Sequence, residues 1–307
     1  MKRVFIAAAA AAALLFAGGC AGGDENSTGP RPSASAAYPV TVGPVTLTQR
    51  PERIVSLTPT ATEMLFAIGA GSQVTAVDDQ SDYPPEAPKS ELSGFTPSAE
   101  AIAAKNPDLV VLSNDIDKIS SQLEKLKIPV FLTPAATTMQ DTYREIGELG
   151  ALTGHQDEAT ALHERMAADI DKIVKAVPQR GAPLTYYYEL SPDLYSATSK
   201  TFIGSIFAMF GMTNVADPAD AAGTHGGYPQ LSQEALIKAN PDTIFLADSD
   251  CCQQSVQTVT ARKGWNTVTA VKSGQIFPLN DDIASRWGPR TVELVQSVAD
   301  AVVKVPA

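Results

Sequence analysis

The chain has 307 residues, a formal net charge of −11 and 44% hydrophobic residues. This length is enough for two lobes of ordinary domain size. The acidic balance argues against nucleic acid as a partner, because a protein that binds phosphate backbones needs clustered Lys and Arg.

The first residues have the pattern of an export signal. Lys2 and Arg3 precede a short apolar run, and small residues then lead to Cys20. The run is too short for a comfortable membrane span, and no later run approaches that length. The junction resembles the lipobox of bacterial lipoproteins, which predicts a signal peptide over 1–19 and a lipid anchor on Cys20. An ordinary cleavage site with a chance cysteine is the alternative. Residues 20–37 are rich in turn formers and predict a flexible tether.

Residues 38–154 predict an N-terminal α/β lobe. Strands alternate with helices, which favours a mostly parallel sheet. Thr60 and Glu63 have the spacing of a capping box and predict a helix that runs to Gly69. The other elements expected here are a hairpin at 40–42 and 45–48, strands at 53–57, 74–77, 109–112 and 129–132, and helices at 117–126 and 140–152.

The segment 155–178 predicts a connecting helix, and residues 179–307 a second α/β lobe. Apolar residues recur on one stripe from Leu162 to Val177, and Pro178 ends the pattern. Such a helix is about 33 Å long, enough to cross between lobes. A single rigid connector predicts small lobe movements. In the second lobe we expect strands at 185–190, 243–247 and 275–279, and helices at 201–210, near 254–262 and from Pro289 onward.

A repeat supports the two-lobe organisation. The stretch 98–112 returns as 232–246, with Ser, Glu, Ala, Asn-Pro-Asp and the final Leu at the same spacing. In each copy Ser98 or Ser232 predicts the cap of a short helix with an acid in its first turn. Asn-Pro-Asp then stops the helix before a buried strand. Common turn chemistry is the alternative reading. In parallel lobes the binding edge is formed by loops after the strands, here 58–60, 78–85, 113–116, 191–200, 248–253 and 280–288.

Several motifs together resemble the solute-binding lipoproteins of bacterial importers for iron–siderophore complexes and cobalamin. The motifs lie at 51–57, 61–65, 69–71, 81–87, 100–110 and 230–234. The resemblance implies two lobes joined by one backbone helix, with a ligand cleft between them. It also implies a monomer that captures a metal chelate outside the membrane and hands it to a permease dimer with cytoplasmic ATPase subunits. No cofactor, metal ligand or catalytic residue is expected, so the protein is not expected to be an enzyme.

In this family one glutamate on each lobe docks into arginine pockets of the permease, and Glu100 and Glu234 match those positions. Two exposed carboxylates at symmetric places would make a two-point electrostatic dock. The alternative is that both acids only stabilise helix N-termini.

The ligand is predicted to be a ferric siderophore, with cobalamin, another corrinoid or heme as alternatives. The loop 82–87 resembles the cobalamin members, but Gln80 and Ser113 stand where those members have aromatic residues. The hairpin before 51–53 resembles the siderophore members. The residues expected to bind the ligand are Gln80, Tyr83, Phe95, Tyr195, Asp282, Arg286, Trp287 and Arg290.

The two arginines suit an anionic ligand, because guanidinium offers a fixed donor fork. Phe95, Tyr195 and Trp287 suit its organic body. A structural ion pair is the alternative for each arginine, and a core position is the alternative for Trp287.

Cys251 and Cys252 are adjacent in a predicted cleft-edge loop. Outside the cytoplasm they can form a vicinal disulfide that stiffens this loop, and a free thiol pair is the alternative.

Two other classes of function compete with chelate binding. A receptor for bare zinc or manganese needs several His and carboxylate ligands. His155 and His163 are expected on the solvated surface, and His225 alone does not make a metal cage. An extracellular enzyme is the second rival, but the chain has none of the common hydrolase, nucleotide-binding or metalloprotease motifs.

Overall fold

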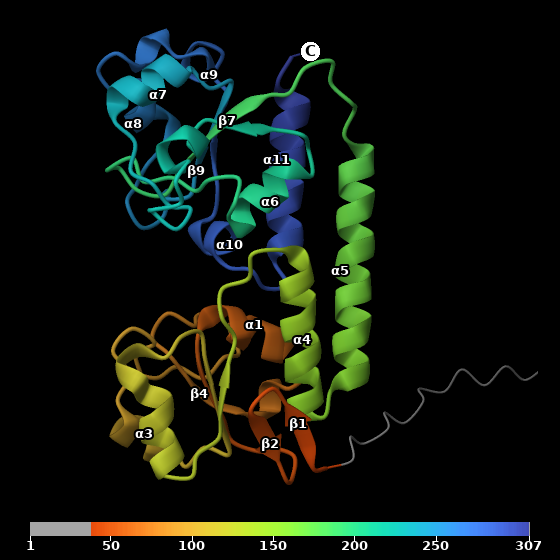
Figure 1. The fold of residues 1–307 in the computed structure, drawn as a ribbon. Coiled ribbons are helices and arrows are strands. Elements are labelled where there is room, and N and C mark those ends of the chain that lie inside the picture. The colour runs from red at the N-terminus through yellow and green to blue at the C-terminus, as the bar shows by residue number, and fades with distance from the viewer. Residues whose placement is uncertain (1–37, 307) are drawn as a thin grey trace, which may run out of the picture. The chain divides into compact units, whose positions relative to one another are not determined.

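The computed structural model describes residues 38–306. They belong to one compact unit. The predicted signal peptide, Cys20 and the tether over 20–37 lie outside the described residues. Within the described part the chain forms two α/β lobes joined by a long helix (Figure 1). None of the helices in residues 38–306 has the length and apolar character needed to cross a membrane.

The N-terminal lobe is built on a four-stranded parallel sheet. Its strand order is β4-β3-β5-β6, and the central strands β3 and β5 are buried along their whole length. The strands are β3 (Ile54–Leu57), β4 (Val74–Val77), β5 (Leu109–Leu112) and β6 (Val130–Leu132). A separate antiparallel hairpin pairs β1 (Val40–Val42) with β2 (Val45–Leu47). The helices are α1 (Pro59–Ala67), α2 (Ala99–Ala103), α3 (Ile119–Lys125) and α4 (Met139–Thr153).

The C-terminal lobe repeats this design. Its sheet has the order β8-β7-β9-β10 and is also parallel, so strands occupy the same relative positions as in the first lobe. The strands are β7 (Thr185–Glu189), β8 (Thr213–Asn214), β9 (Thr243–Leu246) and β10 (Ile276–Pro278). The helices are α6 (Phe202–Ala208), α7 (Gln233–Ala239), α8 (Val256–Thr260), α9 (Thr269–Lys272), α10 (Asp281–Ser285) and α11 (Thr291–Lys304).

The sequence repeat occupies equivalent places in the two lobes. The Ser98 side chain accepts a hydrogen bond from the N–H of Ala101 at the start of α2, and Ser232 accepts one from Ala235 at the start of α7. Strand β5 follows the first copy and β9 follows the second, and each is the third strand along its sheet. The predicted caps and the predicted pair of similar lobes are therefore confirmed.

The Asn-Pro-Asp turn joins each repeat helix to its sheet. Asn106 and Asn240 both have a positive φ of 50°, which asparagine tolerates better than most residues. The carboxylate of Asp108 accepts the N–H groups of Glu52 and Arg53 just before β3. Asp242 accepts the N–H of Thr185 at the start of β7. The repeated aspartate therefore fixes the beginning of β3 in one lobe and of β7 in the other, in addition to its place in the turn after a helix.

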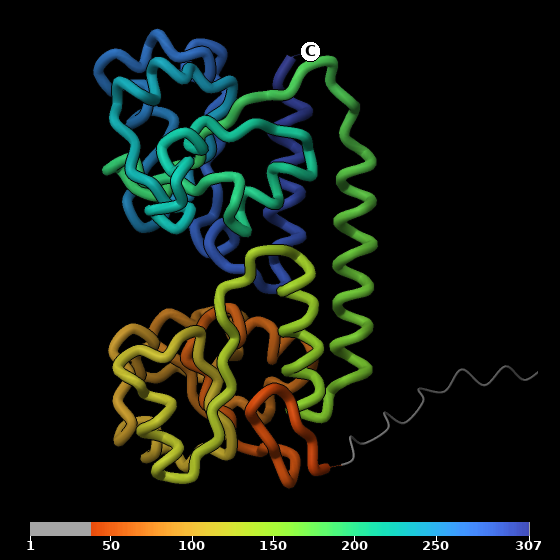
Figure 2. The backbone as a smooth tube through the Cα atoms, viewed as in Figure 1, coloured from red at the N-terminus to blue at the C-terminus, as the bar shows by residue number. Residues whose placement is uncertain are grey.

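Helix α5 (Gln156–Ala176) connects the lobes. It packs against α4 in the first lobe and against α11 in the second (Figure 2). Its buried residues Leu162, Met166 and Ile170 lie in one apolar cluster together with residues from both lobes. The predicted single helix is confirmed. Because its apolar face is packed along both lobes, large separation of the lobes would expose that face to water.

Three local predictions at helix starts are wrong. Helix α1 begins at Pro59 after Thr58, and no capping box forms, because the Glu63 side chain turns to two arginines of the other lobe. Helix α11 begins at Thr291 rather than at Pro289. The predicted loop 280–288 contains the short helix α10, whose first turn is capped by the Asn280 side chain. This helix is too short to show apolar periodicity in the sequence.

Two glycines on α4 test the packing of this helix against α5. A Cβ on Gly150 would lie 2.4 Å from the Cβ of Ala159, whereas a Cβ on Gly147 would meet nothing within 4 Å. We expect Gly150→Ala to lower the free energy of unfolding by about 1–3 kcal/mol through overpacking. Gly147→Ala is the matched control and should raise it by roughly 0.5–1 kcal/mol, since alanine favours the helix. Urea unfolding followed by circular dichroism measures both, and equal effects would contradict this account of the helix contact.

Candidate ligand-binding cleft

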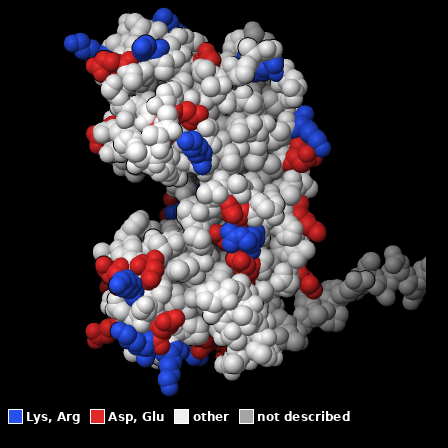
Figure 3. Space-filling model, in the orientation of Figure 1, with Lys and Arg blue, Asp and Glu red and all other residues white. Residues whose placement is uncertain are grey.

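The carboxyl ends of the two sheets face each other. Arg286, in the segment after β10, reaches Glu63 in α1, which follows β3, and Asp82 in the loop after β4. Figure 3 shows a hollow between the two lobes on one side of the molecule. Loops that follow parallel strands line such an edge, so this cleft is the candidate binding site.

The wall on the N-terminal lobe has a pocket of about 80 Å³. Phe95 lies beside it with 72% of its surface exposed, which is the highest value among the large hydrophobic residues described. Gly94 lets this loop approach β3, because a Cβ there would be 2.8 Å from the carbonyl oxygen of Leu57. The other lining residues are Leu57, Thr58, Pro59, Asp78, Gln80, Ser113 and Asn114. The structure thus brings Phe95 and Gln80 together in one pocket.

The wall on the C-terminal lobe carries two exposed tyrosines. Tyr195 pairs with Gln230 in an antiparallel bridge, so the loop after β7 runs beside the segment before α7. Tyr228 lies two residues before Gln230, in the same segment. Tyr195 and Tyr228 are 44% and 46% exposed. The sequence analysis missed Tyr228. The sequence feature that could have indicated Tyr228 is the position of an aromatic residue in a glycine-rich loop directly before the second repeat.

The loop after β9 contains a disulfide between Cys251 and Cys252. The Asp281 carboxylate in the first turn of α10 accepts the N–H of Ser249 and the N–H of Cys251, both at 2.8 Å. This loop is therefore attached to the helix that leads to Arg286.

A buried group of charges lies beneath that loop. Arg262 donates to both carboxylate oxygens of Glu189, at 2.6 and 2.5 Å. Asp248 is fully buried, and neither of its carboxylate oxygens has a hydrogen-bond partner among the described residues. Burial, and then the charge of Glu189, raise the pKa of Asp248 above its usual range. Two buried acids thus lie at the carboxyl ends of β7 and β9, and the one guanidinium beside them binds Glu189.

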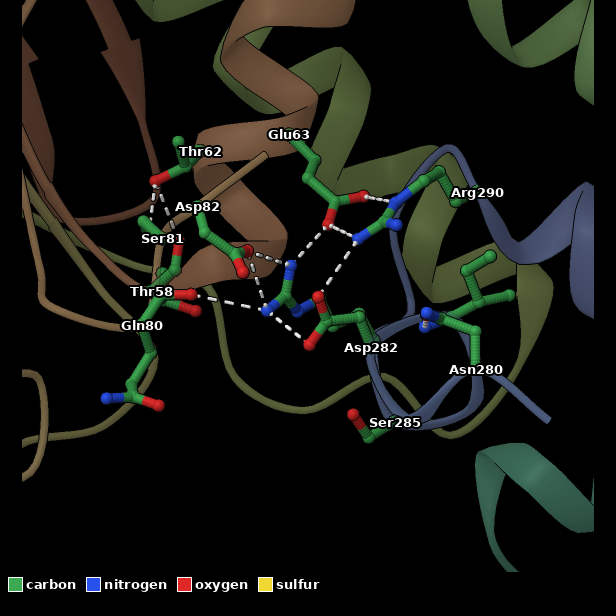
Figure 4. A network of polar contacts seen from close by, with 12 residues as sticks. Thr58, Thr62, Glu63, Gln80, Ser81, Asp82, Asn280, Asp282, Ser285 and Arg290 are labelled. Atoms are coloured by element: carbon green, nitrogen blue, oxygen red, sulfur yellow. Dashed lines mark hydrogen bonds and ion pairs between the residues drawn. The ribbon is translucent and has the colours of Figure 1, made fainter. Parts of the chain in front are cut away.

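A second group, which we call the interlobe ion-pair cluster, joins the lobes. It consists of Glu63, Asp82, Asp282, Arg286 and Arg290 (Figure 4). Glu63 accepts from Arg286 at 2.9 Å and from Arg290 at 2.9 and 2.5 Å. Arg286 also donates to Asp282 at 2.6 Å and to Asp82 at 3.2 Å.

Glu63 is the buried centre of this cluster. Only 2% of its side chain is exposed, against 10% for Arg286 and 13% for Arg290. The Arg290 guanidinium also lies over the Tyr83 ring, 4.2 Å from the ring centre. The structure thus places four predicted ligand residues, Tyr83, Asp282, Arg286 and Arg290, at this junction. Both guanidinium groups have carboxylate partners from the same chain.

Trp287 joins the lobes next to this cluster. Its indole N–H donates to Glu145 Oε2 at 3.2 Å, and its carbonyl oxygen accepts from the Thr142 hydroxyl at 2.9 Å. Trp287 is half-buried and packs against the core cluster shared by both lobes. Burial raises the pKa of Glu145 to about 7, while the hydrogen bond from Trp287 acts in the opposite direction.

Glu100 and Glu234 occupy matched positions. Both are exposed and lie in the first turn of a repeat helix, α2 or α7. Neither takes part in a hydrogen bond or ion pair that would hide its carboxylate within the described residues.

The histidines are scattered through the fold. His155 is half-buried, and its Nε2 lies 2.7 Å from an Arg50 nitrogen and 3.1 Å from the Gln73 amide oxygen. The prediction that His155 is a solvated surface residue is therefore wrong. Within residues 38–306 no group of three or more His, Cys, Asp and Glu side chains is arranged to hold a metal ion.

Comparison with known proteins identifies the class. The family described as Periplasmic binding protein matches residues 54–283. An uncharacterized ABC transporter substrate-binding lipoprotein of Bacillus subtilis, YvrC, is 30% identical over 280 residues, which are 86% of each chain. A cobalamin-binding protein of Halobacterium salinarum is 31% identical over 265 residues, 84% of this chain and 71% of the relative.

A solved structure has the same fold. It is a possible iron-binding (periplasmic solute-binding) protein from Staphylococcus epidermidis, with a TM-score of 0.71 at 26% identity. The match covers 83% of this chain and 100% of that one. The chain therefore belongs to the periplasmic binding protein family, as an ABC-type substrate-binding protein. The family resemblance and the two-lobe α/β fold are confirmed.

The interlobe ion-pair cluster predicts a large effect of Glu63. We expect Glu63→Ala to lower the free energy of unfolding by about 3–5 kcal/mol, because it leaves two partly buried guanidinium groups without their shared partner. Lys175→Ala is the control, since its pair with Asp171 is exposed and should contribute less than about 0.5 kcal/mol. Denaturant unfolding measures both. A Glu63 effect as small as the control would contradict the role given to this cluster.

The pKa of Glu145 predicts a pH dependence of stability. Its folded value of about 7 lies above the ordinary 4.5, so the folded protein holds this proton more tightly than the unfolded chain does. Stability from this group is present in acid and is lost as the pH rises from about 4.5 to about 7.

Glu145→Gln removes that loss and keeps an oxygen acceptor for Trp287. The variant should exceed the parent by about 1–3 kcal/mol at neutral pH and match it at about pH 4, below the ordinary pKa of the group. Unfolding curves at both pH values measure the difference, with Glu164→Gln on the exposed face of α5 as control. A difference that does not change with pH would refute the assignment.

Proposed function

We propose that this protein captures an organic metal chelate of the iron–siderophore type outside the cytoplasm and delivers it to an ABC permease. The observation that carries the proposal is the cleft itself, where the carboxyl ends of two equivalent sheets face each other and exposed aromatic residues stand on both walls. The relatives are solute-binding proteins, and we assign no enzymatic reaction to the chain.

The ligand residues we propose come from both walls. Phe95 and Gln80 contribute from the first lobe, and Tyr195 and Tyr228 from the second. Trp287 lies at the junction, where a bound ligand or a change in lobe contact would alter its fluorescence. Exposed rings supply the apolar contact area that a bulky chelate needs.

A corrinoid is the second candidate. The Halobacterium salinarum relative is named as a cobalamin-binding protein and matches 84% of this chain. The Staphylococcus epidermidis structure is described as possibly iron-binding. Both descriptions are consistent with a cleft that binds a metal complexed by an organic ligand.

Partners and location follow from the class of protein. Substrate-binding proteins of ABC transporters work with a permease and ATPase subunits, and we propose that this chain does so as a monomer. We further propose that Cys20 carries the lipid that keeps it at the outer face of the cytoplasmic membrane, since two acyl chains bury enough methylene groups for stable anchoring.

A fluorescence titration tests the choice of ligand. Purified protein is titrated with a ferric hydroxamate, a ferric catecholate, heme and cyanocobalamin, and tryptophan emission is followed. We expect saturable quenching by at least one of them, with Trp287 as the reporter and the buried Trp265 as background. Replacing Trp287 by Phe removes the signal change while calorimetry still detects binding. If all four chelates fail to bind folded protein, the proposal is wrong.

We also propose that Glu100 and Glu234 dock the two lobes onto the permease. Replacing both by Arg should abolish uptake, because each exposed carboxylate would become a repelling cation, while chelate binding stays within about twofold. The control replaces two other exposed acids, Glu124 and Glu164, by Arg in the same background. Uptake is measured in cells that depend on this transporter. Normal uptake by the docking variant would rule out the assignment.

A further inference from the structure

The loops of the cleft are acidic. We define the cleft loops as the segments after the strand ends on both walls: 78–96, 113–118, 190–201, 215–231, 247–255 and 279–290. These segments hold 14 Asp and Glu residues against 5 Lys and Arg residues. The cations are Lys89, Lys118, Lys200, Arg286 and Arg290. The excess of carboxylates predicts a negative potential over the cleft, and low-dielectric walls strengthen such a potential.

The arginines of these loops are engaged. Arg286 contacts Glu63, Asp82 and Asp282, and Arg290 contacts Glu63 in two hydrogen bonds. Neither side chain has more than 13% of its surface exposed. A ligand carboxylate or catecholate could take these donors only by displacing a carboxylate that is already bound and largely dehydrated. Such an exchange leaves a buried acid unpaired, which is costly.

The three lysines of the cleft loops do not supply the paired donors that a free arginine would offer to an anionic ligand. The N–H groups of His225 and Gly227 lower the pKa of the Asp220 carboxyl, and the charge of Lys200 adds a smaller effect in the same direction. Lys89 and Lys118 are exposed on different loops of the first lobe. An ammonium group is a strongly hydrated point charge without the planar pair of donors that grips an oxyanion.

Besides exposed acids and lysines, the groups available to a ligand include aromatic and neutral side chains. Phe95 on one wall and Tyr195 and Tyr228 on the other expose between 44% and 72% of their surface. Gln80 and Asn114 line the pocket beside Phe95 and offer amide donors and acceptors. Aromatic faces attract cations and apolar bodies and carry negative charge density that disfavours anions.

We propose that this cleft selects metal chelates that are neutral or positively charged and discriminates against anionic ones. The inference rests on the proposed function, because it assigns a charge class to the ligand of the same site. Ferric trihydroxamates with a pendant ammonium group and amide-substituted corrinoids share this chemistry. Ferric tris-catecholates and the free propionate groups of heme are negatively charged and belong to the class that the cleft would disfavour.

The test uses chelates that share one metal cage and differ only in charge. Ferrioxamine B carries a pendant ammonium group, its N-acetyl derivative is neutral, and its N-succinyl derivative carries a carboxylate. Cyanocobalamin and its monocarboxylic acid form a second pair, which separates hydroxamate binding from corrinoid binding. Isothermal titration calorimetry on the purified protein at low salt gives the dissociation constants.

We expect the cationic or neutral member to bind at least about tenfold more tightly than its anionic partner, and the gap to shrink at high salt. Asp79→Asn combined with Asp193→Asn removes one exposed cleft carboxylate from each lobe and should narrow the gap. Glu124→Gln with Glu164→Gln is the charge-matched control outside the cleft loops and should leave it unchanged.

Two other results lead to different conclusions. Equal or tighter binding of the anionic member overturns the charge selection, and it leaves the proposed chelate-binding function standing. If no member of either series binds a protein that circular dichroism shows to be folded, the proposed function fails and the charge selection fails with it.

Discussion

The carboxylate of Glu63 is the contact on which the relation of the two lobes depends. It comes from α1, the helix after β3 in one lobe, and is bound by two arginines that follow β10 in the other. A buried carboxylate is unstable unless its charge is matched, and here two guanidinium groups match it within hydrogen-bond distance. The packed face of α5 adds an apolar connection between the lobes that has no directional preference. The ion pairs restrict the relative position of the lobes, because a bidentate guanidinium–carboxylate pair tolerates only a narrow range of positions.

This arrangement also affects the ligand. Arginines beside a cleft are natural anchors for anionic cargo, but Arg286 and Arg290 already bind acids of their own chain. The interactions that hold the lobes therefore remove the donors that an anionic chelate would need. Besides carboxylates, the walls expose aromatic surface and amide groups. Affinity would then come from buried ring area, and the excess of carboxylates would govern which charges are admitted.

The repeat explains why both walls have the same construction. In each lobe a serine caps the repeat helix, an asparagine with positive φ lies in the turn after it, and an aspartate fixes the start of the strand that opens the parallel sheet. The two repeat helices present Glu100 and Glu234 at equivalent places. Duplicated local chemistry thus yields two similar surfaces, one on each lobe, as a two-point dock on a symmetric partner would require.

Local sequence was sufficient for most of the longer elements and for the class of fold, whereas the short elements β8, α9 and α10 were not predicted. Apolar strands, serine caps, Asn-Pro-Asp turns and the long stripe of α5 depend on neighbours in the chain, so their positions could be predicted to within a few residues. The predicted capping box at Glu63 and the predicted helix start at Pro289 were wrong, because distant partners or a short helix determined the local structure.

The arrangement of the candidate site could not be predicted from local sequence, because its residues come from distant parts of the chain. Glu63 and Arg286, for example, are more than 200 positions apart. No local pattern distinguishes an arginine that faces a ligand from one that binds a buried acid. The exposure of Tyr228 and the burial of Glu145 likewise depend on which surfaces the two lobes bring together. The sequence by itself determined which residues the cleft loops contain and their excess of acid. The tertiary structure alone decided which of their charges are paired, because pairing depends on distances in space.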